Sequence, residues 1–320
     1  MNEKNEKSTQ GMETTFGTRL AYAHGTLADN LALQNFLYLG FTFYFAVVGL
    51  PVLYISLGFI IYSIWDAIND PLLGVLSDKT KTRWGRRKPW IYASTIPLCI
   101  VMVLIWMPPT DSIMITFLYF VFMLILFDFV FTSFTVPFNS LWPEMFLNND
   151  DRASVGALRI LFAVLGVGIA YLLPEFIIED IANKHNLSQT PEQYVLNGII
   201  AAIIVFIVII ILLKFGSFER TEFSKDVEGV PSWKESYKIT FKNKAFMTYC
   251  GVALAVFIVY NILPVIIPLY AIFVLKMEDP GLILFVGLLF GVFSAPLWMH
   301  FRKRWGIRKT YIVILAFWAF

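Results

Sequence analysis

Two carboxylates four residues apart lie within an apolar part of the sequence. In the run Trp65-Asp66-Ala67-Ile68-Asn69-Asp70-Pro71, Asp66 and Asp70 share one helical face with Asn69. A carboxylate at membrane depth is costly, and we expect both acids to be sealed from water and lipid. Two close carboxylates in low dielectric cannot both stay ionised unless a cation sits between them or one holds a proton. The run therefore predicts a site for sodium or a proton. The alternative is a packed interior pair hydrogen-bonded to neighbouring helices.

A second polar stripe follows at helical spacing on an otherwise apolar stretch. Its members are Asp128, Thr132, Thr135 and Asn139, at steps of four, three and four. A stripe that contains an acid indicates a pathway through the membrane. The alternative for each threonine is a packing hydroxyl bonded to its own helix backbone.

A third face combines an acid with a distant arginine. Tyr22, Thr26 and Asp29 share one side of the first apolar stretch, and Arg159 lies within the fifth. Because an intramembrane arginine needs an anionic partner, we hypothesise that Arg159 pairs with Asp29. The alternative is an ion pair with a purely structural role.

The elements that position these residues are membrane helices. The chain has 320 residues, of which 58% are apolar and 15% charged, with a mean hydropathy of +0.69, which disfavours water-soluble enzyme classes. No nucleophile constellation, phosphate-binding loop, disulfide framework or histidine spacing suggests an enzyme, a cofactor or a metal site, so we expect none. The apolar stretches do not alternate as barrel strands would, which predicts an all-α polytopic membrane protein. They cover residues 20–50, 52–76, 89–107, 112–141, 154–178, 195–215, 245–275, 281–300 and 310–320.

An internal repeat indicates how these helices are organised. Residues 83–91 and 304–312 are identical at six of nine positions, at an offset of 221 residues. Each copy lies between two apolar stretches, six helices apart, which resembles the parallel six-helix halves of major facilitator transporters. We therefore expect a piece of a longer chain, because the ninth stretch is too short to cross a bilayer. The predicted parts are a cytoplasmic tail (1–19), a complete six-helix bundle (20–215), a cytoplasmic linker (216–243) and an incomplete C-terminal bundle of about two and a half helices (244–320).

The charges of the loops predict an orientation. Lys and Arg gather in the loop after the second stretch, in the linker and after the eighth stretch, whereas acids dominate the opposite side. The positive-inside rule then places the N-terminus in the cytoplasm. We expect a multi-pass, monomeric protein of the plasma membrane, with the lipid bilayer and no nucleic acid as partner.

Several of these motifs resemble one transporter family. The runs Trp65-Asp66-Ala67-Ile68-Asn69-Asp70-Pro71-Leu72-Leu73-Gly74, Arg83-Trp84-Gly85-Arg86-Arg87-Lys88-Pro89-Trp90-Ile91 and Val136-Pro137-Phe138-Asn139-Ser140-Leu141, together with Arg159, are similar to those of the glycoside-pentoside-hexuronide:cation symporters. The resemblance implies a twelve-helix symporter that moves a sugar or related small solute with sodium, lithium or a proton. It implies that Asp66, Asn69, Asp70 and Thr132 hold the cation, and that Asp29 and Arg159 bind the solute.

The residues expected to bind solute differ from those of the sugar-transporting members of the family. Ala28 stands where they have a lysine, Thr135 where they have an acid, and Asn139 where they have an aromatic residue. Asp128 lies on the same face as Thr135 and is a substitute for the absent acid. The predicted solute-binding residues are therefore Asp29, Arg159, Asp128, Thr135, Asn139 and Tyr22. An amphiphilic solute such as a lysophospholipid is the alternative to a sugar, and a non-transporting membrane scaffold is an alternative of another class.

The loop after the second stretch resembles the signature loop of the wider superfamily. We predict a conformational gate formed by Asp78, Gly85, Arg86 and Arg87. Asp78 at a helix end can form charge-assisted bonds with the guanidinium groups and hold the cytoplasmic side closed in one state. The alternative is that the arginines bind lipid headgroups.

Overall fold

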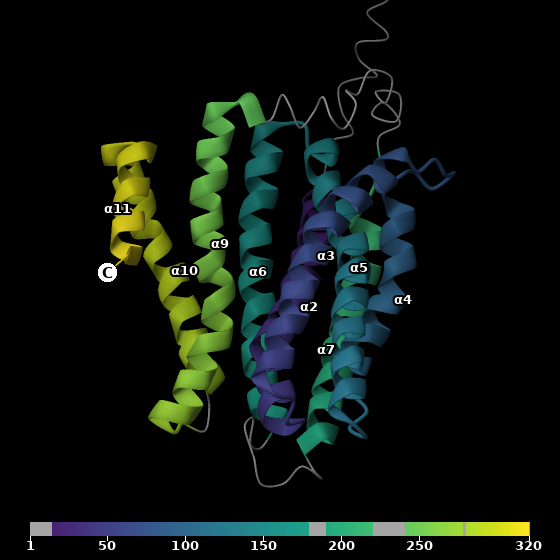
Figure 1. The fold of residues 1–320 in the computed structure, drawn as a ribbon. Coiled ribbons are helices and arrows are strands. Elements are labelled where there is room, and N and C mark those ends of the chain that lie inside the picture. The colour runs from purple at the N-terminus through teal and green to yellow at the C-terminus, as the bar shows by residue number, and fades with distance from the viewer. Residues whose placement is uncertain (1–14, 179–189, 220–240, 278–279, 320) are drawn as a thin grey trace, which may run out of the picture.

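The computed structural model describes residues 15–178, 190–219, 241–277 and 280–319, and within these ranges the chain is helical apart from short connections (Figure 1). This confirms the predicted all-α class. Most of the predicted N-terminal tail and of the linker lies outside the described residues. The helices are α2 (Phe16–Thr42), α3 (Val52–Lys79), α4 (Lys88–Leu104), α5 (Ile113–Met145), α6 (Asn149–Ile177), α7 (Thr190–Ile211), α9 (Lys244–Tyr270), α10 (Pro280–Trp305) and α11 (Ile307–Ala319).

Each predicted apolar stretch corresponds to one of these helices. Several helices begin where a side chain binds a free N–H of the first turn: Thr15, Ser112, Asn148 and Asn243 act in this way. π-Helical turns at 43–47, 212–216 and 271–275 extend α2, α7 and α9. Among the described residues, five helical segments are long and apolar enough to cross a membrane by length and composition: 52–79, 113–145, 149–177, 191–216 and 244–275.

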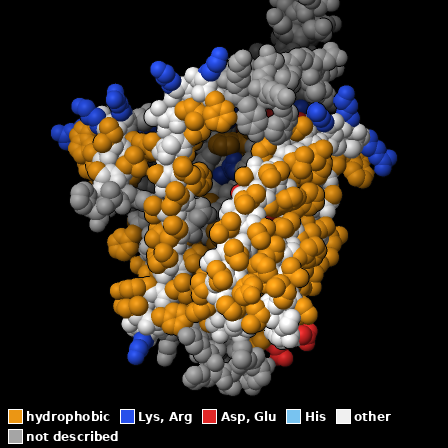
Figure 2. All heavy atoms as spheres, in the orientation of Figure 1, with side chains coloured by type: hydrophobic (Ala, Val, Ile, Leu, Met, Phe, Trp, Pro, Cys, Tyr) orange, Lys and Arg blue, Asp and Glu red, His pale blue; other side chains and the backbone are white. Residues whose placement is uncertain are grey.

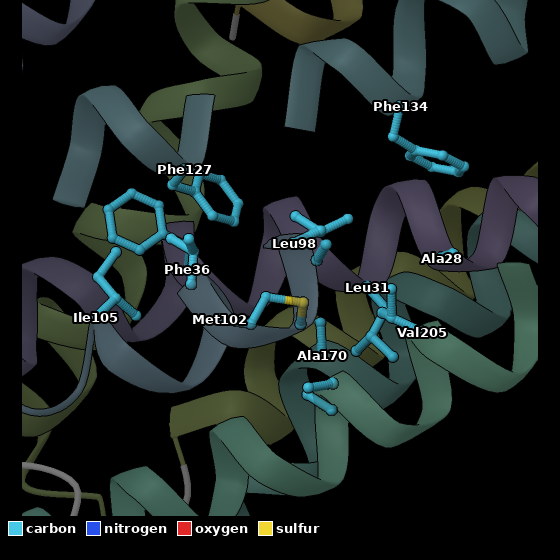
Figure 3. Close-up of a cluster of buried hydrophobic side chains, with 14 of the residues drawn as sticks. Ala28, Leu31, Phe36, Leu98, Met102, Ile105, Phe127, Phe134, Ala170 and Val205 are labelled. Atoms are coloured by element: carbon cyan, nitrogen blue, oxygen red, sulfur yellow. The ribbon is translucent and has the colours of Figure 1, made fainter. Parts of the chain in front are cut away.

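Helices α2 to α7 form one bundle, called here the N-terminal bundle. Helix α2 packs against α6 and α7, α3 against α5, and α4 against α5 and α7. Figure 3 shows apolar side chains from several of these helices meeting in the core. Helices α2 and α6 approach closely at Gly166, where an added Cβ would lie 2.6 Å from the Leu27 carbonyl oxygen. A glycine is needed there because no side chain fits between the two backbones.

Helices α9 to α11, called here the C-terminal group, meet the N-terminal bundle near one end. Helix α9 packs against α2, and α10 packs against α6. The Gly281 N–H at the start of α10 donates to the Glu175 carboxylate of α6 at 2.7 Å, and the Tyr38 hydroxyl of α2 donates to the same oxygen. A Cβ added to Gly281 would lie 2.4 Å from the Tyr171 carbonyl oxygen, so the backbones are in direct contact here. We call this contact the α6–α10 contact.

A hollow separates the two parts farther from the α6–α10 contact. Figure 2 shows a hollow between α9 and the N-terminal bundle, with a basic side chain inside it. Exposed apolar side chains cover the flanks, and Lys and Arg gather at the end away from the α6–α10 contact. An apolar belt with a basic end is the surface pattern of a membrane protein.

Candidate functional site

A cluster of acids and polar side chains lies between α3 and α5, and we call it the acidic cluster. The Asn69 amide Nδ2 of α3 donates to Asp128 Oδ2 of α5 at 2.8 Å, and Thr132 Oγ1 of α5 donates to Asp70 Oδ1 at 3.2 Å. Asp66 and Asp70 both lie close enough to Asp128 to repel it electrostatically. The spacing of three and four residues along each helix places these groups at the packed α3–α5 contact.

The members of the cluster differ in burial. Asn69, Asp128 and Thr132 are 0%, 2% and 3% exposed, whereas Asp66 is partly exposed and Asp70 is exposed. The expectation that both aspartates are sealed is therefore wrong for this chain. The reason is that α3 packs mainly against α5 among the described helices, which leaves the rest of its surface uncovered.

The chemistry of the cluster suits a small monovalent cation. Its groups offer carboxylate, amide and hydroxyl oxygens, the ligands that hard cations prefer. The Asn69 Oδ1 atom is buried and has no hydrogen-bond partner, and a buried amide oxygen without a partner is costly unless a ligand satisfies it. Among the described residues, no three His, Cys, Asp or Glu side chains converge as they do in a metal centre. A sodium-like ion would therefore be held by a mixed set of oxygens.

Arg159 of α6 organises a second polar group, which we call the arginine site. Its Nε donates to Thr26 Oγ1 at 3.0 Å, and an NH2 group donates to Asn139 Oδ1 at 2.5 Å. The guanidinium carbon lies 4.7 Å from the centre of the Trp142 ring, within cation–π range. Asp29 interacts with Arg159 electrostatically, but the direct ion pair that we hypothesised is absent, and two of the Arg159 donors bind Thr26 and Asn139 instead.

Three of the residues predicted to bind solute lie outside the arginine site. Asp128 contacts Asn69 of the acidic cluster, and its assignment to the solute site stays a prediction. Tyr22 is fully buried and its hydroxyl donates to the Phe138 carbonyl at 2.7 Å, so it holds α2 against α5 and lines no accessible surface. Thr135, 9% exposed, lies on α5 between Thr132 of the acidic cluster and Asn139 of the arginine site.

The predicted gate residues meet at the basic end of the N-terminal bundle. An NH2 group of Arg87 lies 3.1 Å from Asp78 and 2.7 Å from Glu144, and Arg86 lies 2.5 Å from Glu144. The predicted charge-assisted bonds at Asp78 are thus present. They connect α3, α4 and α5 within one bundle. Their role as a gate stays a prediction.

Glu219 completes this network from the segment after α7. Its carboxylate accepts the backbone N–H groups of Arg86, Arg87 and Lys88 at 2.7–2.8 Å, at the start of α4. Gly85 has a φ of +104°, and an added Cβ would lie 2.4 Å from the Glu219 carboxylate. The glycine is therefore required both by its backbone conformation and by the close carboxylate.

Several residues of the acidic cluster, the arginine site and the ion-pair network are not predicted from the sequence. Tyr62 of α3 interacts with Asp128, and its place one helical turn before Asp66 could have revealed it. Trp142 lies three residues after Asn139 on the same face. For Glu144 and Glu219, no local pattern predicts which arginines they contact.

Comparisons with known proteins support the family and the fold. The family model described as MFS/sugar transport protein matches residues 10–320. The chain belongs to this family. Relatives of the family named as symporters or transporters support the predicted glycoside-pentoside-hexuronide:cation symporter membership, and the chain is a multi-pass membrane protein.

The individual relatives of this MFS/sugar transport family are distant. An uncharacterized symporter of Synechocystis is 30% identical over 164 residues, 49% of this chain and 30% of that protein. An isoprimeverose transporter of Lactiplantibacillus pentosus is 28% identical over 152 residues, 47% and 32% of the two chains. A sodium-dependent lysophosphatidylcholine symporter of Xenopus tropicalis is 26% identical over 294 residues, 82% and 55%. The matches thus span about a third to a half of each relative's length.

Proposed function

We propose that the protein is a secondary active transporter that carries a sugar or glycoside-like solute together with sodium, lithium or a proton. The main observation that supports this proposal is the acidic cluster. Two aspartates and a buried, unpartnered amide oxygen are grouped between two helices of a membrane protein, and a bound cation or proton would offset the repulsion between the carboxylates. Asp66, Asn69, Asp70 and Thr132 hold the cation in this account.

The solute binds at the arginine site beside the cation. Asp29 and Arg159 offer opposite charges, Asn139 offers an exposed amide, and Thr135 lies between the two sites. Sugar hydroxyls can both donate to a carboxylate and accept from a guanidinium. Because both sites share helix α5, a cation that neutralises the acidic cluster favours the α5 position that binds solute. By linkage, solute then raises cation affinity by the same factor.

Transport follows from alternating access, and the structure corresponds to one of its states. Contacts at the α6–α10 end hold the two parts together, while a hollow separates α9 from the N-terminal bundle toward the basic end (Figure 2). The positive-inside rule supports a cytoplasmic location of the basic end and of the N-terminus, so this state is open to the cytoplasm. The plasma membrane is the location, and the monomer is the transporting unit.

Uptake into liposomes tests the proposal. The purified protein is reconstituted, and radiolabelled glycosides, uronides and lysolipids are offered with and without an inward sodium, lithium or proton gradient. We expect accumulation of one solute class above equilibrium only with a gradient. Equal uptake with and without every gradient would contradict cation coupling, and an absence of both solute and cation flux would favour the scaffold alternative.

A lysophospholipid is the second candidate solute. The relatives named as sodium-dependent lysophosphatidylcholine symporters match 78–82% of this chain, against 46–49% for the bacterial symporters. Competition by lysophosphatidylcholine below its micellar concentration, without competition by glycosides, would select this solute class.

A further inference from the structure

Asp128 is a buried acid without a basic partner. It is 2% exposed, and among the described residues no Lys, Arg or His forms an ion pair with it. The groups that face it are Asn69, Asp66, Asp70 and Tyr62, all on α3. Arg159 of α6 donates to Thr26 and Asn139 instead. A buried carboxylate in this position either holds a proton or is stabilised by a positive charge from a ligand.

The Asn69 amide points to where that ligand binds. Its Nδ2 donates to Asp128, and because a carboxylate only accepts hydrogen bonds, this contact fixes which end of the amide faces α5. The Oδ1 atom on the same carbon is the other end of this amide, and it is buried and without a partner. An oriented, unsatisfied carbonyl oxygen is a ready ligand for a cation. Asp128 thus positions Asn69 as well as adding charge.

We propose that Asp128 is a third acidic residue of the cation site, one that fixes the Asn69 carbonyl toward the ion and raises the affinity for a sodium- or lithium-like ion. This inference rests on the proposed function. It assigns to Asp128 a positioning and electrostatic role, whereas Asp66 and Asp70 are the direct acidic ligands. Asp128 then acts on the ion through Asn69 and through its charge, without being a direct ligand.

Equilibrium binding of radiolabelled sodium to the purified protein, without solute, tests this inference. Asp128→Asn keeps an acceptor for the Asn69 amide but removes the charge, and we expect the Kd for sodium to rise about tenfold or more, equivalent to about 1.4 kcal/mol. Asp128→Leu removes the acceptor as well, and we expect a further rise of about threefold or more, because the freed amide can turn its oxygen away. Leucine suits a membrane helix, so this variant also covers a failure of Asp128→Asn to fold.

Ser133→Ala is the matched control. Ser133 is buried on the same helix and its hydroxyl donates to the Phe129 carbonyl of its own helix, so its loss should leave sodium affinity unchanged. Melting temperatures without sodium check that each variant is folded.

Each outcome decides the inference. Asp128→Asn binding sodium as tightly as the parent, while Asp66→Asn does not bind, would overturn the inference and leave the proposed function standing. An equal Kd for Asp128→Asn and Asp128→Leu would overturn the positioning role. If the folded parent binds neither sodium nor lithium saturably, both the inference and sodium coupling are wrong.

Discussion

Replacing Gly281 by alanine should open the α6–α10 contact. In the structure, a Cβ at this position would lie 2.4 Å from both the Tyr171 carbonyl oxygen and a Glu175 carboxylate oxygen, and 2.9 Å from the Tyr38 hydroxyl. Ordinary contacts are about 1 Å longer, and the backbone carbonyl cannot rotate away as a side chain could. The alanine therefore fits only if α10 moves away from α6.

The magnitude follows from overpacking. Forcing one methyl group into a packed contact costs about 1–3 kcal/mol. This cost falls only on the state in which α6 and α10 touch, so the equilibrium between the two access states should shift about 5–150-fold toward the state open at this end. Gly287→Ala is the control, because Gly287 lies on the same helix with no atom within 4 Å of the added Cβ.

Distances between two spin labels, measured by double electron–electron resonance, report the shift between the two access states. Spin labels replace Ile113 at the start of α5 and Leu282 at the start of α10, both exposed, after the two free cysteines Cys99 and Cys250 are changed to serine. We expect Gly281→Ala to move the distance distribution to longer values and Gly287→Ala to leave it unchanged. An unchanged distribution in Gly281→Ala would refute the assignment of this contact to one access state.

Three further predictions concern stability and solute binding. Glu144→Gln should lower the free energy of unfolding by about 1–3 kcal/mol, because it removes the negative charge that Arg86 and the buried Arg87 both contact. Thermal melting measures this change. A melting temperature equal to that of the parent would count against a stabilising role of these ion pairs. Gly166→Ala should lower the free energy of unfolding by about 1–3 kcal/mol through its clash with α2. Gly251→Ala, in open space on α9, should leave it unchanged or raise it by up to about 1 kcal/mol. A change of the same sign in both variants would contradict the close approach of α2 and α6. Arg159→Lys should weaken solute binding about tenfold or more in equilibrium binding, because a lysine ammonium cannot bind two acceptors in the fixed geometry of a guanidinium. The same substitution should leave the sodium affinity measured without solute unchanged. A parallel loss of solute and sodium affinity would show that the two sites are not distinct.

The helices and the common face of Asp66, Asn69 and Asp70 could be predicted from the sequence because both depend on local spacing. Apolar stretches of about the length of a bilayer crossing predict where α2 to α10 run, and steps of three and four residues place Asp66, Asn69 and Asp70 at one contact. Thr132 is placed with them only through the resemblance to the symporter family, because spacing along one helix does not show which helices are neighbours.

Contacts between distant segments could not be predicted in this way. The Arg159 donors could have bound Asp29 or any acceptor on a neighbouring helix, and packing selects Thr26 and Asn139. Asp128 and Thr135 share a helical face, so only the position of α3 separates the cation group from the solute group. The α6–α10 contact depends on a backbone N–H at Gly281, which leaves no signature in a side-chain pattern.

Gradient-driven solute accumulation by Asp70→Asn is the most direct test of the central claim that the acidic cluster couples solute to a cation. The parent and the variant are reconstituted in the same liposomes, and uptake is followed with an inward sodium, lithium or proton gradient and without one. The account predicts that the variant loses all stimulation by the gradient. Undiminished accumulation against the solute gradient by Asp70→Asn would contradict the account.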